Sequence, residues 1–334
     1  MLASTALDAG LGAWFVARPP RWLKTTHPAV AAAALTVGST AVGLPLSALS
    51  RERSRRVGLD TQTWRAWGSD IVKATAIGAP LAGGAGWLVV GGMRRYGDRW
   101  WLPGAAGLTA AGVLTLVAGP TLIDPLFNKF EPAEPEVAAR IQGIAARAGV
   151  KVDRVLVMDA SKRTTASNAY VTGLGATKRV VFYDTLLRDF SDAEVDFVVA
   201  HEFAHVRHRD VQTGLAIVAV SSPAMVFGIA ELARALGARP DARAFAPLAV
   251  AAGLLAPALG VITNGFSRAI ERRADRFAMG FVEDPTTQID FQKRICVKNV
   301  AEPEPPRWVQ ALYGSHPTTL ERIAIAAEVA ASGS

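Results

Sequence analysis

The chain has 334 residues, of which 50% are hydrophobic and 19% charged, and its net charge is +7. The charged fraction is lower than the average of about a quarter in soluble domains, and the hydrophobic residues are clustered, which argues against an ordinary soluble protein. The basic residues flank the apolar clusters, so their distribution excludes nucleic acid as the partner. A lone cysteine, Cys296, excludes an intramolecular disulfide and a thiolate zinc cluster, and is predicted to be a small buried hydrophobic residue.

Five nearly uncharged blocks rich in Ala, Gly, Leu and Val predict membrane helices. Each is close to the ~20 residues that cross ~30 Å of hydrocarbon. An earlier apolar stretch, Leu11 to Val16, is too short to span the membrane, and the sequence leaves open whether residues 1–27 form a further segment. We therefore expect a mainly α integral membrane protein, in contact with the lipid bilayer, with about five to six transmembrane helices. The five blocks are residues 28–50, 71–92, 101–119, 214–237 and 244–264.

Positive charge between the spans predicts the orientation. Five spans place the loop after the first span on the same side as residues 120–213 and 265–334, and this loop holds the most arginines. The positive-inside rule then puts those segments in the cytoplasm, although Arg94, Arg95 and Arg99 lie on the opposite side. Frequent arginine and alanine indicate a GC-rich bacterium, so the predicted location is a bacterial inner (plasma) membrane with residues 120–213 and 265–334 facing the cytoplasm. The loop arginines are Arg51, Arg53, Arg55, Arg56 and Arg65.

The spans divide the chain into four parts. Residues 1–119 form an N-terminal membrane region with three spans, and residues 120–213 form a segment outside the membrane. Residues 214–264 contain two further spans, and residues 265–334 form a C-terminal segment.

Within residues 120–213, the pattern predicts a small α+β region. Helical spacing of apolar residues from Pro135 to Gly149 indicates a helix that ends at the glycine. Short β-branched runs at Arg154–Met158 and Arg179–Tyr183 predict strands, and Asn168–Thr172 predicts a third. The third strand is expected to join the second through a turn that contains Gly173, Gly175 and Ala176.

The stretch His201 to His205 reads HEFAH and carries the main chemical signal. Ser191 followed by Glu194 is a capping box, which predicts that a helix begins there and continues through this stretch. Residues four apart share one face of a helix, so the two imidazoles can bind one Zn²⁺ ion while Glu202 reaches a water molecule on the open side of the metal. The alternative interpretation is a surface helix with two solvated histidines.

A third ligand must come from another part of the chain, because catalytic zinc usually has three protein ligands. A straight helix cannot place three ligands around one tetrahedral metal, which disfavours His208 and favours Glu271 on a helix after the last span. Asp275, one turn later, can accept the second ring N–H of a ligating histidine. The alternative is that Glu271 and Asp275 belong to an ordinary charged helix.

The chain resembles the Ste24-type CAAX prenyl proteases, the integral-membrane M48 zinc metallopeptidases. The resemblance covers about residues 40–325 and rests on six stretches in the same order. The Pro-Leu-Phe-Asn-Lys-Phe string and the His-Pro element favour Ste24 over the related HtpX-like membrane proteases. The six stretches are Leu44–Ser47, Asp124–Pro132, Ser167–Tyr170, His201–His205, Ser267–Asp275, and His316-Pro317 with Glu321-Arg322.

The resemblance implies a zincin-like site with His201, His205 and Glu271 as zinc ligands. Glu202 would be the general base that activates the zinc-bound water and then passes its proton to the leaving amine.

Three further roles follow from the resemblance alone. Asn168 would lie on the edge strand that receives the substrate backbone, His316 would donate a hydrogen bond to the developing oxyanion, and Arg322 would orient the substrate or its supporting network. The alternatives are a turn residue for Asn168, a helix-cap histidine for His316 and a surface arginine for Arg322.

We therefore expect a membrane-embedded zinc metalloendopeptidase that cleaves membrane-associated or CAAX-type (prenylated) proteins. Farnesylated CAAX proteins are not expected in a bacterium, which leaves the natural substrate open. The alternatives are an HtpX-like quality-control protease acting on misfolded membrane proteins, and a non-catalytic membrane scaffold or transporter.

Overall fold

The structure is a computed structural model that describes residues 2–173, 178–282 and 284–332. The chain divides into two compact units. Unit 1 comprises Met1–Arg53, Thr63–Gly112 and Leu215–Pro257. Unit 2 comprises Ser54–Gln62, Val113–Gly214 and Ala258–Ser334.

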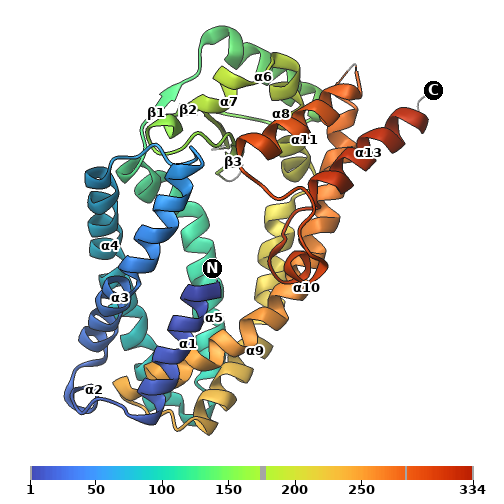
Figure 1. Ribbon diagram of the computed structural model, residues 1–334. Helices are drawn as coiled ribbons and strands as arrows, with labels where there is room; N and C mark the ends of the chain where they lie inside the picture. The colour runs from blue at the N-terminus through green and yellow to red at the C-terminus, as the bar shows by residue number, and fades with distance from the viewer. Residues whose placement is uncertain (1, 174–177, 283, 333–334) are drawn as a thin grey trace. The chain divides into compact units, whose positions relative to one another are not determined.

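Unit 1 is helical, and its helices include those long and apolar enough to cross a membrane (Figure 1). Five such helices occur in the described part of the chain, which confirms the five predicted spans. The N-terminal region forms a 16-residue helix, α1, longer than the apolar stretch suggested but not among these five. The helices with residues in unit 1 are α1 (Leu2–Ala17), α2 (Trp22–Thr25), α3 (Pro28–Arg56), α4 (Trp64–Tyr96), α5 (Trp101–Ala118), α9 (Asp210–Ala235) and α10 (Phe245–Met279), with short 3-10 turns η1 (Gly97–Arg99) and η6 (Ala242–Ala244).

Glycine allows α3 and α4 to pack closely within unit 1. A Cβ atom at Gly83 would lie 2.9 Å from the carbonyl oxygen of Ala29, and one at Gly86 would lie 2.6 Å from the Cβ of Ala32. Small residues at such contacts are typical of membrane helices, whose association depends on close packing rather than on the hydrophobic effect.

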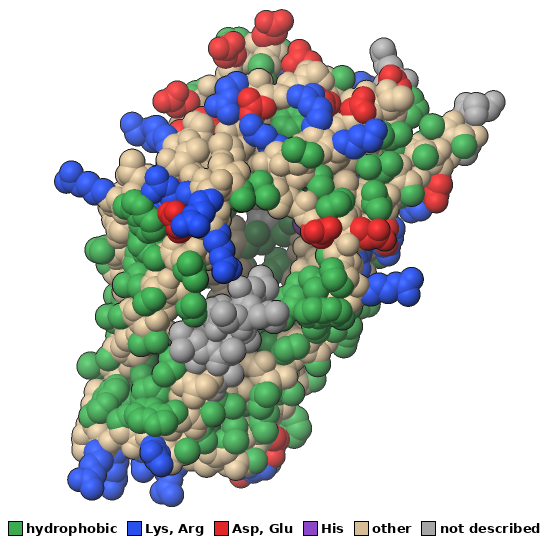
Figure 2. All heavy atoms as spheres, viewed as in Figure 1, with side chains coloured by type: hydrophobic (Ala, Val, Ile, Leu, Met, Phe, Trp, Pro, Cys, Tyr) green, Lys and Arg blue, Asp and Glu red, His purple; other side chains and the backbone are tan. Residues whose placement is uncertain are grey.

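Large hydrophobic side chains point outward along these helices. Val220 is 82% exposed, and Val72 and Leu81 are each 67% exposed. Figure 2 shows hydrophobic side chains spread over the long helices of unit 1 on the face in view. Water would make such exposure unfavourable, whereas lipid tails solvate it, so the surface fits a membrane-embedded unit.

Unit 2 contains a four-stranded sheet with the order β1-β2-β4-β3. The strands are β1 (Phe130–Pro132), β2 (Arg154–Met158), β3 (Ala169–Thr172) and β4 (Arg179–Tyr183). β2 and β4 are parallel, with Leu156 opposite Val181, and the other two pairs are antiparallel. The three predicted strands are present, and β3 lies at one end of the sheet. Of the predicted turn between β3 and β4, Gly175 and Ala176 lie outside the described residues.

Helices pack on this sheet to form the largest apolar core of unit 2. In α6 (Pro135–Ala148), proline occupies the first turn and Gly149 ends the helix with a left-handed φ of 67°. Ile141 of α6 and Phe182 of β4 are fully buried in this core. The other helices of unit 2 are α7 (Asp184–Asp189), α8 (Asp192–Arg207), α11 (Thr286–Lys298), α12 (Arg307–Tyr313) and α13 (Thr319–Ser332), with short turns η2 (Gly119–Ile123), η3 (Asp124–Leu126) and η4 (Ala160–Lys162).

The C-terminal helices of unit 2 complete the surroundings of α8. α11 packs on both α8 and α13. Cys296 of α11 is buried, as predicted, and its thiol contacts the carbonyl oxygen of Ala301 at 3.3 Å.

Candidate metal centre

A capping box fixes the start of α8. Ser191 Oγ accepts a hydrogen bond from the amide of Glu194, and Glu194 Oε2 accepts one from the amide of Ser191 at 2.8 Å, which confirms the sequence prediction. The helix then continues without interruption through His201 and His205, so both imidazoles lie on one face.

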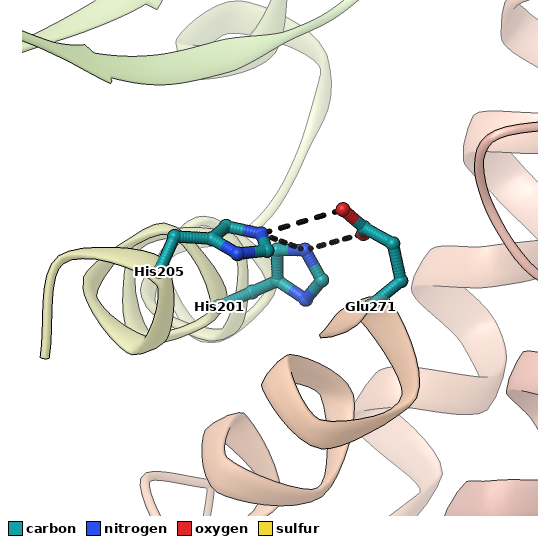
Figure 3. Close-up of side chains that lie close together, drawn as sticks. All are labelled: His201, His205 and Glu271. Atoms are coloured by element: carbon teal, nitrogen blue, oxygen red, sulfur yellow. Dashed lines mark hydrogen bonds and ion pairs between the residues drawn. The ribbon is translucent and has the colours of Figure 1, made fainter. Parts of the chain in front are cut away.

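His201, His205 and Glu271 come together, as predicted, although Glu271 lies on α10, 70 residues from His201 (Figure 3). His201 Nε2 lies 3.1 Å from Glu271 Oε2 and 3.2 Å from His205 Nε2, and His205 Nε2 lies 3.5 Å from Glu271 Oε1. Two ligands at ~2.05 Å from a tetrahedral zinc ion are about 3.4 Å apart, so the two imidazole nitrogens and the Glu271 carboxylate have the spacing such an ion requires. The donor set of two imidazoles and one carboxylate also suits zinc.

Asp275 lies behind His201. Its Oδ1 is 2.9 Å from His201 Nδ1, and its side chain is fully buried. Arg322 donates two hydrogen bonds to the same carboxylate, from Nε at 2.8 Å and Nη2 at 2.5 Å. The carboxylate therefore fixes the orientation of the His201 ring, and Arg322 balances its charge.

His205 has an equivalent partner that the sequence interpretation missed. Its Nδ1 lies 2.9 Å from Asp210 Oδ2, and Arg273 forms an ion pair with the other carboxylate oxygen of Asp210. Asp210 is brought back toward the imidazole because Arg209 adopts a left-handed φ of 58° between α8 and α9. The only available signal was a carboxylate five residues after His205, and the turn that makes it useful has no sequence signature.

His208 makes contacts away from the metal centre. Its Nδ1 lies 2.8 Å from the carbonyl oxygen of Ala204, and its ring stacks edge-on against Phe277. Among the described residues it does not belong to the group able to hold a metal ion.

Burial and neighbouring charges shift several pKa values in the centre, among them those of His201, Glu202 and His316. Burial lowers the pKa of His201, but its hydrogen bonds to Asp275 and Glu271 outweigh this effect and raise the pKa to about 9. Burial raises the pKa of Glu202, against the opposing influence of the two nearby histidines. Burial also lowers the pKa of His316, which keeps this imidazole neutral over a wider pH range.

A cavity of about 180 Å³ opens beside these residues. Asn168, Glu202, His316 and Arg322 all line it, together with His201. The remaining walls are largely apolar and come from α7, α8 and α11: Leu186, Phe197, Val198, Phe291 and Ile295. The four residues that the resemblance singled out around the zinc ligands thus share one cavity.

The loop that carries His316 is held by backbone contacts. Arg268 Nη1 donates hydrogen bonds to the carbonyl oxygens of Gln310 and Gly314. Ser315 Oγ lies 2.9 Å from His316 Nδ1, which leaves Nε2 directed toward the centre, 3.5 Å from Glu271 Oε2.

Comparison with known proteins agrees with this geometry. Residues 131–330 match peptidase family M48, and residues 10–129 match the CAAX prenyl protease N-terminal region, described as five membrane helices. The chain belongs to peptidase family M48.

Several relatives are similar over much of the chain. The metalloprotease YhfN of Bacillus subtilis is 30% identical over 300 residues, which cover 86% of this chain and 70% of YhfN. CAAX prenyl protease 1 of Saccharomyces cerevisiae is 34% identical over 50% of this chain and 38% of its own length. A Protease HtpX homolog of Burkholderia thailandensis is 28% identical over 74% of this chain and 93% of its own length. The match therefore spans well under half of the yeast protein but nearly the whole HtpX homolog.

A solved structure shares the fold. The crystal structure of S. mikatae Ste24p superimposes with a TM-score of 0.81 at 24% identity, covering 96% of this chain and 81% of that chain. This M48 chain is thus an integral membrane metalloprotease, related to the CAAX prenyl proteases and to HtpX.

Proposed function

We propose that the chain is a zinc metalloendopeptidase in which His201, His205 and Glu271 hold the metal. The observation that carries this proposal is the spacing of their donor atoms, between 3.1 and 3.5 Å, in a donor set typical of zinc. The carboxylates of Asp275 and Asp210 support it, because each orients the second nitrogen of one histidine.

Glu202 and His316, which also line the cavity, have separate roles in the reaction. A zinc ion held here would lower the pKa of a bound water molecule and polarise the substrate carbonyl. Glu202 takes the proton of the attacking water and delivers it to the leaving amine, a role for which its raised pKa is suited. His316 donates a hydrogen bond from its Nε2–H group to the developing oxyanion, and its lowered pKa keeps the imidazole neutral.

The substrate peptide pairs with the outer edge of β3. β3 is the last strand in the order β1-β2-β4-β3, and the cavity begins at its first residues. Addition of an extended peptide to an open sheet edge is a common mode of recognition. Asn168, immediately before β3, binds this peptide where it approaches Glu202, and Arg322 acts through Asp275.

The substrates we propose are membrane-associated proteins, cleaved on the cytoplasmic side of a bacterial inner membrane; CAAX-type (prenylated) peptides are probes of this class, and the natural substrate need not carry a farnesyl group. The match of residues 10–129 to the CAAX prenyl protease N-terminal region supports this class. The second candidate is HtpX-like cleavage of misfolded membrane proteins, and the match over 93% of an HtpX homolog supports it.

Glu202→Gln tests the catalytic proposal. Purified wild type and variant should bind zinc equally, measured by elemental analysis, because Glu202 is not a ligand. Only the wild type should cleave a substrate in a chelator-sensitive way. Equal cleavage by both proteins would refute the role of Glu202, and loss of zinc from the variant would refute the ligand assignment.

The substrate class is tested with three probes: a farnesylated CAAX peptide, its unprenylated twin, and a detergent-solubilised membrane protein. Faster cleavage of the farnesylated peptide than of its twin supports the CAAX class. Cleavage of the unfolded membrane protein with no response to the prenyl group favours the HtpX-like function. The products are identified by mass spectrometry.

A further inference from the structure

The side chain of Asn299 pairs with the backbone of Ser167, the residue two positions before β3. Asn299 Oδ1 accepts the amide of Ser167 at 2.9 Å, and Asn299 Nδ2 donates to the carbonyl oxygen of Ser167 at 3.2 Å. A residue on a neighbouring strand would make the same exchange of one N–H and one C=O. The carboxamide thus substitutes for one peptide group of an adjacent strand.

This contact is on the outer edge of β3. The carbonyl of Asn168 faces β4, where it accepts the amide of Tyr183 at 2.9 Å. Backbone groups alternate in direction along an antiparallel strand, so those of Ser167, Ala169 and Val171 face away from β4. Asn299 occupies the first of these three positions, while among the described residues no strand pairs with the other two. The amide of Ala169 donates to the neighbouring Asn168 Oδ1 at 3.0 Å, so its carbonyl and both backbone groups of Val171 are the ones left for a peptide.

Ion pairs to α7 and α8 fix α11, which ends just before Asn299. Arg294 Nη1 lies 2.5 Å from Glu194 Oε2 at the start of α8, and Lys298 Nζ lies 2.6 Å from Asp189 Oδ2 at the end of α7. Phe291, Ile295 and Asn299 follow at intervals of four residues, and all three line the cavity. Asn299 is therefore the polar end of an apolar stripe that faces the cavity.

The backbone after Asn299 is strained. Val300 adopts a left-handed φ of 51°, and the amide of Ala301 donates to the carbonyl oxygen of Cys296 at 2.9 Å, which completes a Schellman motif. Glycine is the usual residue at this position, because a β-branched side chain is unfavourable there. Surrounding contacts offset this strain. The left-handed turn ends the helix at Asn299, on the side that faces Ser167.

We propose that Asn299 is a positioning residue that closes one end of the substrate-binding edge and sets the register of the bound peptide. The inference rests on the proposed function, since it assumes that the peptide pairs with β3. With Asn299 in place, an extended peptide can pair with Ala169 and Val171 but cannot continue to Ser167. The scissile bond is thereby held at one position relative to Glu202.

Removal of the carboxamide frees a further pairing position. In Asn299→Ala, the amide and carbonyl of Ser167 are available to a peptide, so a second register becomes possible. Side chains alternate with a period of two along a strand, so the new register differs by two residues. Two equally populated registers divide the bound peptide between them, so at saturating peptide kcat for the original bond falls about twofold, whereas kcat/KM for that bond stays the same.

The test uses a peptide from β-casein that the wild-type protein cleaves at a single bond. We expect Asn299→Ala to cleave a second bond two residues away at a comparable rate. Thr185→Val is the matched control, because Thr185 Oγ1 donates to the carbonyl oxygen of Ala166 in the same segment at 2.7 Å but does not line the cavity. The control should retain the single cleavage site.

Cleavage of the peptide by Asn299→Ala at the original bond alone would overturn the inference. Cleavage at the same second bond by Thr185→Val would also overturn it, because the effect would then come from a general loosening of the segment. Should Asn299→Ala show no turnover, hydrogen exchange in the Glu202→Gln background decides. The peptide should protect the amide of Val171 in Glu202→Gln alone, and also that of Ser167 once Asn299 is replaced. Absence of added protection refutes the inference, whereas failure of the wild type to cleave any probe refutes the proposed function.

Discussion

Replacement of Asp275 by asparagine should weaken zinc binding although Asp275 is not a ligand. Asp275 is fully buried, accepts two hydrogen bonds from Arg322 and lies 2.9 Å from His201 Nδ1. Asparagine has the same size but only one oxygen, so its NH₂ group must face either the imidazole or the guanidinium. His201 loses either its orienting acceptor or the charge that makes its other nitrogen a stronger donor to the metal.

The magnitude follows from the environment of the carboxylate. Partners of this kind typically contribute 10–100-fold to metal affinity, that is, about 1.4–2.7 kcal/mol. Asp275 is fully buried and its second partner, Arg322, is only 17% exposed, so we expect a loss near the upper limit, about 100-fold. The equivalent change Asp210→Asn should cost about 10-fold, because its second partner, Arg273, is 46% exposed and more strongly screened by solvent.

Competition with a chromophoric zinc chelator measures both affinities in detergent solution. Thermal unfolding monitored by circular dichroism must show that each variant is folded at the temperature of the titration. Wild-type affinity in folded Asp275→Asn would refute the reasoning. A larger loss in Asp210→Asn than in Asp275→Asn would refute the argument from burial.

Three further predictions concern separate parts of unit 2. His201 has a raised pKa of about 9, so in protein stripped of metal by chelation its protonated form stabilises the fold fully below pH ~6.5, and this contribution is lost as pH rises through about 9. Because zinc must displace the proton, zinc affinity should rise by up to tenfold per pH unit between these limits. Zinc titrations that do not depend on pH would contradict the assignment. Val300→Gly should relieve the strain of the left-handed backbone and raise the free energy of unfolding by about 1 kcal/mol, measured as a higher Tm. A lower Tm would show that the valine side chain stabilises the fold by more than its backbone strain destabilises it. Ser191→Ala removes one half of the capping box and should lower the free energy of unfolding by about 1 kcal/mol, whereas Ser191→Asp should retain most of the wild-type stability. Equal stability of Ser191→Ala and wild type would show that the cap is dispensable.

Local signals in the sequence predicted much of the fold. The strands at Arg154–Met158 and Arg179–Tyr183 have the predicted boundaries, because β-branched runs bounded by polar residues determine both identity and extent. The start of α8 is confirmed because a capping box is a local device that requires only Ser191 and Glu194. The five membrane helices are confirmed because length and hydropathy alone distinguish them.

The supporting residues of the site depend on contacts between distant segments and were not predictable in this way. Asp210 reaches His205 only because Arg209 turns the chain with a positive φ, which arginine rarely adopts. Asn299 lies 132 residues from the backbone that it contacts. Glu271 was predicted as a ligand because resemblance and a charged helix pattern pointed to the same residue, not because any spacing joins it to His201.

The short edge of β3 has a consequence for substrate selection. Ala169 and Val171 present two outward-facing backbone groups each, of which the Ala169 amide already donates to Asn168 Oδ1 at 3.0 Å. Three hydrogen bonds of ~1 kcal/mol amount to about 3 kcal/mol, or an affinity of several millimolar. The adjoining cavity, about 180 Å³, is too small to add a large contact area. A freely diffusing protein at micromolar concentration would seldom occupy such an edge. A substrate confined to the same bilayer, however, reaches millimolar effective concentration near the site, so anchoring in the membrane would replace a deep binding groove as the basis of selection.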